Sequence, residues 1–255
     1  MQIITSKDNE IIKSVRKLKE RKYREKTGEY IIEGIKLIEE AIQEKVEISK
    51  IIICEECIKD GKIESKLMYE IAKYDCISVT EKIFKTITDV NNPQGILAVI
   101  KRDIEKKQDI EYAEDVILVL DNIQDPGNLG TILRTVDSIG LKQIIISKGS
   151  VDPFSPKVVR STMGAIFRVN IIETEDLVEL LKEIKKHKFK IISTSLDSEE
   201  SIYDIDYSKK VIVIGNEANG VSADVLNTSD KKVKIPMLRK NRKLKRFSSN
   251  RSYFI

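Results

Sequence analysis

The sequence predicts an α/β protein in two parts, and three observations support this fold class. Apolar runs such as VILVLDNI, QIIISKG and KVIVIGNE are typical of buried strands in a parallel sheet. Helical patterns such as NLGTILRTVDSIG and TEDLVELLKEIKKH separate several of these runs. The charged segment RDIEKKQDIEYAED precedes the first run and indicates a linker. We expect an α/β domain over 1–104, a linker over 105–115 and a mainly parallel α/β domain over 116–255.

In the first part, apolar spacing defines each expected element. Residues from about 7 to 48 favour helices, because their apolar residues recur three and four positions apart, and GEYII interrupts them as a short strand. The runs ISKIIIC, CISV and GILAVIK are expected strands, separated by the expected helices KIESKLMYEIAKY and EKIFKTITD. This alternation describes a small α/β domain.

In the second part, the runs RVNII, KIISTSL and KVKIPM extend the series of expected strands, and SPKVVRSTMGAI is a further expected helix. Such an order favours a parallel sheet covered by helices on both faces. In sheets of this kind, ligands bind where the loops leave the carboxyl ends of the strands. Functional residues are therefore expected at those positions.

Composition excludes several classes of protein. No apolar run is long enough to span a bilayer, and the first twenty residues lack the pattern of a secretory signal, so we expect a cytoplasmic protein. The three cysteines, Cys54, Cys57 and Cys76, are too few and too isolated for a disulfide framework or a zinc site, and we expect free thiols. The single histidine, His187, lies in the Lys-rich stretch KKHKFK and is expected to be solvated. Any chemistry must therefore proceed without a histidine base.

Net charge is weak evidence for a nucleic-acid partner. The chain carries a net charge of +4, but 239–255 alone contains seven Lys or Arg and no acid. Without those seven cations the net charge becomes −3. The basic character therefore belongs to the end of the chain alone.

Three stretches at expected strand ends contain candidate functional residues. LDNIQDPGNLGTILRTVDSIG has turn and N-cap residues before an expected helix that starts near Asn128, and Arg134 on that helix could be solvated or could bind a phosphate. VIVIGNEANGVS places Gly215, Asn216, Glu217 and Gly220 after a strand, yet it lacks the GxGxxG and GKS/GKT motifs of nucleotide sites. KIPM is the third strand end.

Taken together and in this order, these stretches resemble the SpoU/TrmH family of RNA ribose 2′-O-methyltransferases, members of the SPOUT class. NIQDPGNLGTILRTVDSIG, PKVVRSTMGAI, VIVIGNEANGVS and KIPM support the resemblance over about 116–238. GEYIIEGIKLIEEAI and NNPQGILAVI resemble the RNA substrate-binding domain that many members carry. The activity itself does not follow from spacing alone.

The resemblance implies a deep trefoil knot in the C-terminal sheet, an S-adenosylmethionine cofactor, a homodimer and no metal. It implies an RNA substrate, with ribosomal RNA preferred to transfer RNA because of the appended N-terminal domain. The residues that match the catalytic positions of the family are Arg134, Asn128 and Glu217. The residues that match cofactor-binding positions are Thr194, Gly215, Asn216, Gly220, Ile235 and Met237.

The implied reaction is an in-line attack of a ribose 2′-hydroxyl on a sulfonium methyl group. The methyl donor is already activated, so the protein mainly positions the reactants and handles one proton. A guanidinium is a poor base, which favours a role for Arg134 in holding the RNA phosphate and the attacking oxygen. Proton removal by a phosphate or by water stays an open alternative.

The end of the sequence departs from the family. In family members, a segment of the type SLNVSxAxxI follows the IPM strand end, where it closes the knot and contributes to the cofactor and active sites. In this chain, RKNRKLKRFSSNRSYFI stands in its place. One permitted encoding of 239–255, read from its second base, translates as GKIESLNVSAAIGVIL. We hypothesise that one extra nucleotide has shifted the reading frame here. The alternatives are a true basic RNA-binding tail and a catalytically impaired RNA-binding protein.

Overall fold

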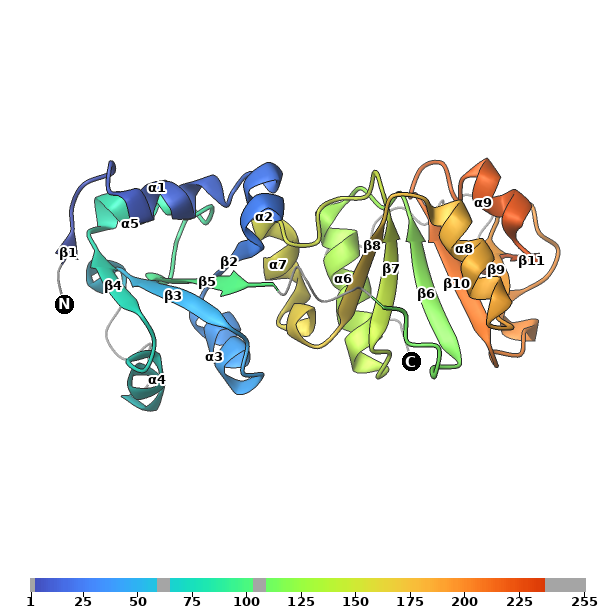
Figure 1. Cartoon of the computed structure of the whole chain (residues 1–255), viewed down its shortest axis with the longest axis horizontal. Helices are drawn as coiled ribbons and strands as arrows, with labels where there is room; N and C mark the ends of the chain where they lie inside the picture. Colours follow the sequence, from blue (N-terminus) through green and yellow to red (C-terminus); the bar gives the residue numbers. More distant parts are fainter. Residues whose placement is uncertain (1–2, 59–64, 103–108, 237–255) are drawn as a thin grey trace. The chain divides into compact units, whose positions relative to one another are not determined.

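The computed structural model describes residues 3–58, 65–102 and 109–236, and its chain divides into two compact units (Figure 1). Unit 1 contains Met1–Lys107 and Asp152–Arg168, and unit 2 contains Gln108–Val151 and Val169–Ile255. The sequence boundaries at 104 and 116 assign 152–168 to the second domain, whereas in the structure these residues pack within unit 1. The hypothesis of a frame shift over 239–255 falls outside the described residues and stays a prediction.

Unit 1 is built on a mixed five-stranded sheet of order β1-β4-β3-β5-β2. Strands β1, β4 and β3 pair in parallel, while β5 is antiparallel to both β3 and β2. The strands are β1 (Ile3–Ile4), β2 (Glu29–Glu33), β3 (Ile48–Ile53), β4 (Cys76–Val79) and β5 (Ile96–Lys101). Cys54 and Cys76 are free thiols, as expected.

The helices of unit 1 are α1 (Glu10–Lys17), α2 (Arg21–Thr27), α3 (Ile35–Gln43), α4 (Ser65–Ile71), α5 (Glu81–Ile87) and α7 (Pro156–Thr162), with short 3₁₀ turns η1 (Glu55–Cys57) and η2 (Ala165–Phe167). Most of these helices bury apolar residues, whereas the buried residue of α2 is Arg24. Helix α1 begins where the side chain of Asn9 accepts the Ile11 N–H, and Ile12 and Val15 of its inner face pack with Phe84 of α5. Helix α2 ends at Gly28, whose φ of 66° is left-handed.

The segment 152–168 is held in unit 1 by a buried ion pair and by aromatic contact. Arg24 of α2 is 4% exposed and donates from Nε to Oδ2 of Asp152 at 2.9 Å. It also donates from Nη1 to the carbonyl of Leu18 at 2.6 Å. The ring of Phe154 lies 5.1 Å from that of Tyr30 on β2. Helix α7 therefore packs beside β2, although the strands that flank it in the sequence belong to unit 2.

Unit 2 contains a six-stranded sheet of order β11-β9-β10-β6-β7-β8, and all its strand pairings are parallel. The strands are β6 (Val116–Asp121), β7 (Gln143–Ser147), β8 (Asn170–Thr174), β9 (Lys190–Thr194), β10 (Lys210–Gly215) and β11 (Lys231–Val233). Each expected strand run is found, which confirms the parallel α/β class. The knot stays a prediction, because the segment that would close it lies among 237–255, outside the described residues.

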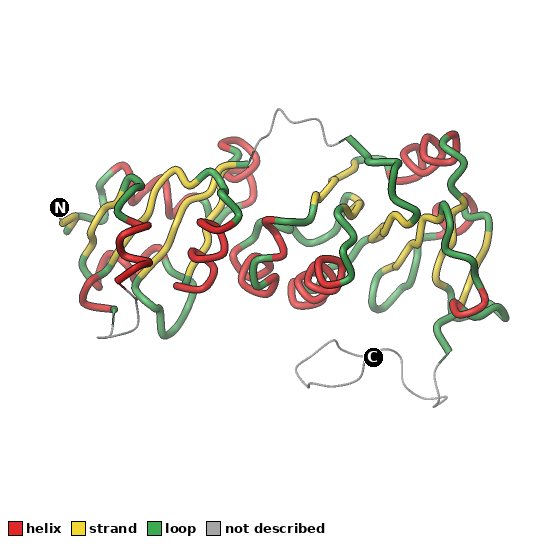
Figure 2. The backbone as a smooth tube through the Cα atoms, turned by 90° about the horizontal axis from the view of Figure 1, so that it is seen from below, coloured by secondary structure: helices red, strands yellow, loops and turns green. Residues whose placement is uncertain are grey.

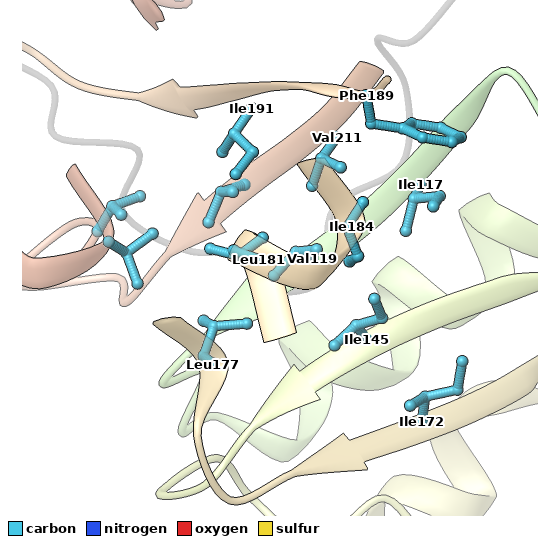
Figure 3. Packing of buried hydrophobic residues seen from close by; sticks show 13 residues of the cluster. Ile117, Val119, Ile145, Ile172, Leu177, Leu181, Ile184, Phe189, Ile191 and Val211 are labelled. Atoms are coloured by element: carbon cyan, nitrogen blue, oxygen red, sulfur yellow. The ribbon is translucent and has the colours of Figure 1, made fainter. Parts of the chain in front are cut away.

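The main core of unit 2 lies between this sheet and two helices, α8 (Leu177–Lys186) and α9 (Ala223–Thr228). Figure 3 shows Leu181 and Ile184 of α8 among Ile117, Val119 and Ile145 of the sheet. These side chains have no exposed surface, as expected for parallel strands. His187, at the end of α8, is exposed as expected.

The opposite face of the sheet carries α6 (Pro126–Ser138), so helices lie on both sides of the strands (Figure 2). Coverage of this face by the described residues is less complete than the sequence predicts. Val116 and Leu118 of β6 are half-buried and pack with Ile202 and Ile205, in and after the 3₁₀ turn η3 (Ile202–Asp204). Among the described residues, no helix is long and apolar enough to cross a membrane.

Candidate active site

The predicted functional residues gather at the carboxyl edge of the unit 2 sheet. Strands β6 and β10 pair in parallel with Gly215 opposite Asp121, so the loops that follow these residues start side by side. Strand β9 is parallel to β10 and ends at Thr194. Gly215 and Thr194 therefore lie at one edge of the sheet, with the loops that carry Asn128 and Glu217.

The first loop runs from Asn122 to the start of α6. Asn122 adopts a left-handed φ of 60°, and its N–H donates to Oγ of Ser147 at the end of β7 (2.8 Å). Asp125 is the N-cap of α6, and its side chain accepts the Asn128 N–H at 2.9 Å. Pro126 occupies the first turn, where its missing N–H costs nothing. This local chemistry fixes Asn128 at the amino end of the helix.

The second loop, 216–222, folds back tightly over the end of β10. A Cβ on Gly215 would lie 2.1 Å from the main-chain carbon of Gly220, so only glycine fits there. Asn216 and Gly220 exchange two main-chain hydrogen bonds of 2.9 Å. The loop is therefore a closed turn.

Asn216 is a structural residue of this loop. Its Oδ1 accepts the N–H groups of Ala218 and Asn219 at 2.9 and 3.0 Å, and its Nδ2 donates to the carbonyl of Asn122 at 2.9 Å. The residue is 8% exposed, and its main-chain N–H and C=O already pair with Gly220. Its side chain thus joins the two loops, and these bonds occupy both acceptor positions of Oδ1 and one of the two hydrogens of Nδ2.

The two loops meet through a contact between two predicted catalytic residues. Nδ2 of Asn128 donates to Oε1 of Glu217 at 2.8 Å, although the residues are 89 positions apart in the sequence. Glu217 is exposed and Asn128 is half-buried. The amide holds one carboxylate oxygen and leaves the other directed to solvent or to a bound molecule.

Arg134 lies on α6 and is exposed. It is not part of the contact between Asn128 and Glu217. Within the described ranges, no hydrogen bond or ion pair engages its guanidinium. Six residues along an α-helix correspond to about one and two-thirds turns, so Arg134 and Asn128 point in different directions. The structure does not join Arg134 to the pair, and its guanidinium is available to bind an anion.

The remaining predicted cofactor residues lie at the neighbouring strand ends. Thr194 at the end of β9 donates from Oγ1 to the Val213 carbonyl of β10 at 3.1 Å. Gly220 is exposed, and nothing lies within 4 Å of the position that its Cβ would take. Ile235, shortly after β11, is 38% exposed. Met237 lies outside the described residues. In the part of the chain that the structure describes, no group of three or more His, Cys, Asp or Glu could hold a metal ion.

Comparison with known proteins identifies the family of both parts. Residues 115–244 match the SpoU rRNA Methylase family, and residues 9–98 match the MRM3-like substrate binding domain. The first match covers all the candidate site residues at the strand ends of unit 2 and half of the chain. The chain belongs to the SpoU rRNA methylase family. This confirms the resemblance drawn from the sequence motifs.

Two relatives of this SpoU-family chain carry names of rRNA methyltransferases. It is 31% identical over 238 residues to the Bacillus subtilis 23S rRNA (guanosine(2553)-2′-O)-methyltransferase RlmP, with 93% of this chain and 91% of that protein covered. It is 34% identical over 163 residues to the human mitochondrial rRNA methyltransferase 3, with 61% of this chain and 37% of that protein covered.

Solved structures agree with the family assignment. The AdoMet-bound rRNA methyltransferase from Sinorhizobium meliloti is 27% identical, with a TM-score of 0.78 and coverage of 94% of this chain and 91% of that one. A TrmH-family RNA methyltransferase described as putative, from Porphyromonas gingivalis, is 29% identical, with a TM-score of 0.75 and coverage of 89% and 87%.

Sequence reasoning missed the polar residues beneath this SpoU-family site. Asp121, Ser147 and Ser222 share hydrogen bonds under the two loops, and Asp121 is only 5% exposed. In the sequence, Asp121 reads as an ordinary turn residue after VILVL. The available signal was its position at the last residue of a buried strand, where an acid needs a specific partner.

Proposed function

We propose that this protein is an S-adenosylmethionine-dependent methyltransferase that modifies a ribose 2′-hydroxyl of structured RNA, with ribosomal RNA as its substrate class. The observation that carries the proposal is the Asn128–Glu217 contact at the carboxyl edge of a parallel sheet, in a SpoU-family chain. The name of its full-length relative supports this reaction and substrate. Transfer RNA is the less favoured substrate, because the N-terminal domain matches a substrate-binding domain of rRNA methyltransferase type.

The strand-end residues fit S-adenosylmethionine. Ile235 offers exposed apolar surface, Gly220 leaves open space above its main chain, and Thr194 lies at the neighbouring strand end. Gly215 and Asn216 shape the loop that would border the cofactor. The bound cofactor supplies a methyl group that is already activated by its sulfonium charge.

The side chains of the site divide the remaining work of positioning and proton handling. Asn128 holds one oxygen of Glu217, so the other oxygen can accept a hydrogen bond from a ribose hydroxyl. The guanidinium of Arg134 presents a planar set of donors that matches a phosphate. Arg134 therefore holds the RNA backbone near the attacking oxygen, while a phosphate or water takes the proton.

Two further properties belong to the proposal. A homodimer would bring a second copy of the exposed Arg134 and Glu217 to the assembly, and light scattering of the purified protein would measure its mass. Cytoplasmic location is proposed from the class of substrate, and fractionation of cells that express the protein would test it.

The experiment is a methylation assay on ribosomal and transfer RNA with tritiated S-adenosylmethionine. A 2′-O-methyl group blocks alkaline cleavage at its own nucleotide, because the 2′-oxygen is the attacking group in that cleavage, so gaps in the alkaline ladder map the product. We expect label in ribosomal RNA. Label in transfer RNA alone would overturn the substrate class.

Replacement of Arg134 tests the role of its guanidinium. Arg134→Ala should lower the rate on the order of 100-fold, because a pre-positioned charged donor is lost. Lys182→Ala, which removes an exposed cation paired with Glu179 on α8, should leave the rate unchanged. Equal rates for wild type and Arg134→Ala would remove this residue from the site.

The second candidate function is a non-catalytic RNA-binding protein, favoured by the absence of an SLNVS-type segment after IPM. A version that carries GKIESLNVSAAIGVIL in place of 239–255 separates the two. Methyl transfer by the replaced version alone would support the frame hypothesis and assign the present chain to RNA binding. Failure of both versions on all RNA would refute the methyltransferase proposal.

A further inference from the structure

Asp121 is a buried carboxylate that the roles assigned above do not use. It is the last residue of β6, is 5% exposed and stands opposite Gly215 of β10. Buried acids usually pair with a cation, because desolvation of a lone charge is costly. Within the described residues, no Lys or Arg forms an ion pair with Asp121. Its hydrogen bonds must therefore account for its position.

Those hydrogen bonds join the ends of three strands. Oδ2 of Asp121 accepts the Ser222 N–H at 2.7 Å, a short charge-assisted bond. Oδ1 accepts a longer bond from Oγ of Ser147 at the end of β7 (3.4 Å). The same Ser147 oxygen accepts the N–H of Asn122 at 2.8 Å. Asp121 thus connects β6 and β7 with the loop that follows β10.

The bond to Ser222 fixes the far end of the 216–222 loop. The near end of the loop is already fixed, because Gly215 is in register with Asp121 in the sheet. Between these ends, Asn216 and Gly220 close the turn, and Glu217 extends from it to Asn128. The turn is held to the first loop by Asn216, whose Nδ2 donates to the Asn122 carbonyl, and to the end of β6 by the Ser222 bond, so both attachments orient Glu217.

We infer that Asp121 is a positioning residue of the candidate active site: its carboxylate anchors the exit of the 216–222 loop so that Glu217 meets Asn128. The inference rests on the proposed function in that it gives Glu217 and Asn128 a part in methyl transfer. Asp121 touches neither reactant and acts through the loop.

Two substitutions at Asp121 separate anchoring from charge. Asn at this position can accept the Ser222 N–H through Oδ1 while its amide group donates to Ser147, so Asp121→Asn retains the anchor. Asp121→Ala leaves the Ser222 N–H without its acceptor. If Asp121 anchors the loop, Asp121→Asn should retain the methylation rate that Asp121→Ala loses.

A third substitution removes the donor and leaves Asp121 in place. Ser222 is exposed, its side chain makes no capping bond, and its φ of −61° is the value that proline adopts. Ser222→Pro therefore deletes the N–H that Asp121 accepts, and the proline ring carbon takes the place of that hydrogen, so the Asp121 carboxylate has to move away. It should reproduce the effect of Asp121→Ala, and it serves as the second variant if Asp121→Ala fails to fold.

The experiment combines kinetics with a double-mutant cycle. Asp121→Ala and Ser222→Pro should lower kcat of RNA methylation on the order of 100-fold, because Glu217 is displaced, with a much smaller effect on KM. In a Glu217→Gln background the same changes should have little further effect, because Asp121 acts through that residue. Additive losses, or a loss for Asp121→Asn as large as for Asp121→Ala, would overturn the positioning role.

Hydrogen exchange provides a readout that does not need activity. The Gly220 N–H, bonded to the Asn216 carbonyl, should exchange at least about 10-fold faster in Asp121→Ala than in wild type, because the closed turn opens more often. Unchanged exchange at Gly220 would refute the anchor even if the wild-type protein methylates RNA. If the wild-type protein does not methylate RNA, but Gly220 still exchanges faster in Asp121→Ala than in wild type, the proposed function is refuted and the anchor is supported.

The matched control is Asp230→Ala. Asp230 also accepts a main-chain N–H, that of Ile191 at 2.7 Å, but near the start of β9, at the opposite end of that strand from Thr194. Its replacement should leave kcat and Gly220 exchange unchanged. An equal effect of Asp230→Ala would show that general loosening of unit 2, and not the Asp121 anchor, controls the loop.

Discussion

Asp152 of unit 1 is half-buried and Asp121 of unit 2 is buried, and different partners compensate their charge. The side chain of Asp152 is 12% exposed and pairs with the guanidinium of Arg24, whose side chain is 5% exposed. Asp152 also accepts the Phe154 N–H at 2.7 Å, whereas the partners of Asp121 among the described residues are only neutral donors, a main-chain N–H and a serine hydroxyl. The ion pair joins an N-terminal helix to the segment 152–168, whereas the hydrogen bonds orient a loop that exposes Glu217.

This difference indicates two uses of a buried acid. An ion pair with a full cation makes each partner dependent on the other, so loss of one leaves an uncompensated charge. A carboxylate that accepts main-chain N–H groups fixes backbone and leaves nearby side chains available for chemistry. Unit 1 thus uses its aspartate for cohesion, and unit 2 uses its aspartate for geometry.

The largest expected effect comes from the ion pair. Arg24→Ala should lower the free energy of unfolding by about 3–5 kcal/mol, because Asp152 stays buried without its cation. Urea unfolding of the whole chain measures this loss. The control Arg21→Ala disrupts the exposed i,i+4 pair with Glu25 and should cost below about 1 kcal/mol. A loss of the same size for both arginines would contradict the cohesive role of the Arg24–Asp152 pair.

An intermediate effect is expected from the tight turn of unit 2. Gly215→Ala places a Cβ 2.1 Å from the main chain of Gly220, and the forced shift should cost roughly 1–3 kcal/mol of unfolding free energy. It should also separate Glu217 from Asn128, detected as a fall in methylation rate.

The control for this substitution is Gly140→Ala. Gly140 has a φ of +79° with nothing within 4 Å of a new Cβ, so alanine there strains the backbone alone by about 1–2 kcal/mol. It should leave the methylation rate unchanged. A Gly215→Ala protein with wild-type rate would show that the fold of the 216–222 loop is not needed for the site.

The sequence predicts the strands of both units because apolar runs report burial directly. It could not predict that 152–168 joins unit 1, because Arg24 and Asp152 are 128 positions apart and each reads as an ordinary charged residue. The Asn128–Glu217 contact was accessible in part, since both residues follow neighbouring strands of one edge and match motifs of the family. The structural role of Asn216 could not be predicted from the sequence, because the sequence does not show that its side-chain amide hydrogen-bonds within and between the loops.

The smallest effect concerns Asp230, which combines both kinds of partner at an exposed position. Partial burial raises the pKa of its carboxyl, but the hydrogen bonds from Lys185 and the Ile191 N–H outweigh this, and the net pKa is lowered. A lowered folded-state pKa contributes stability above the ordinary value near 3.8, and this contribution is lost as the pH falls through the folded-state pKa. Asp230→Asn should therefore cost stability at pH 7, by less than about 1 kcal/mol because the pair is exposed to solvent, and less still at pH 3.

Glu33 of unit 1 provides the comparison of opposite sign. Burial raises the pKa of its carboxyl more than the hydrogen bond from Thr88 lowers it. A raised folded-state pKa means that ionisation opposes folding, so stability is lost as the pH rises above the ordinary value near 4.5. Glu33→Gln should therefore gain stability over wild type at pH 7 and lose that advantage at pH 3, measured by urea unfolding at both values. Main-chain and cation partners favour the charge of Asp230, whereas burial disfavours the charge of Glu33. The stability differences of Asp230→Asn and Glu33→Gln from wild type should therefore change with pH in opposite directions. A change in the same direction would show that these surroundings do not set the ionisation of the two carboxyls.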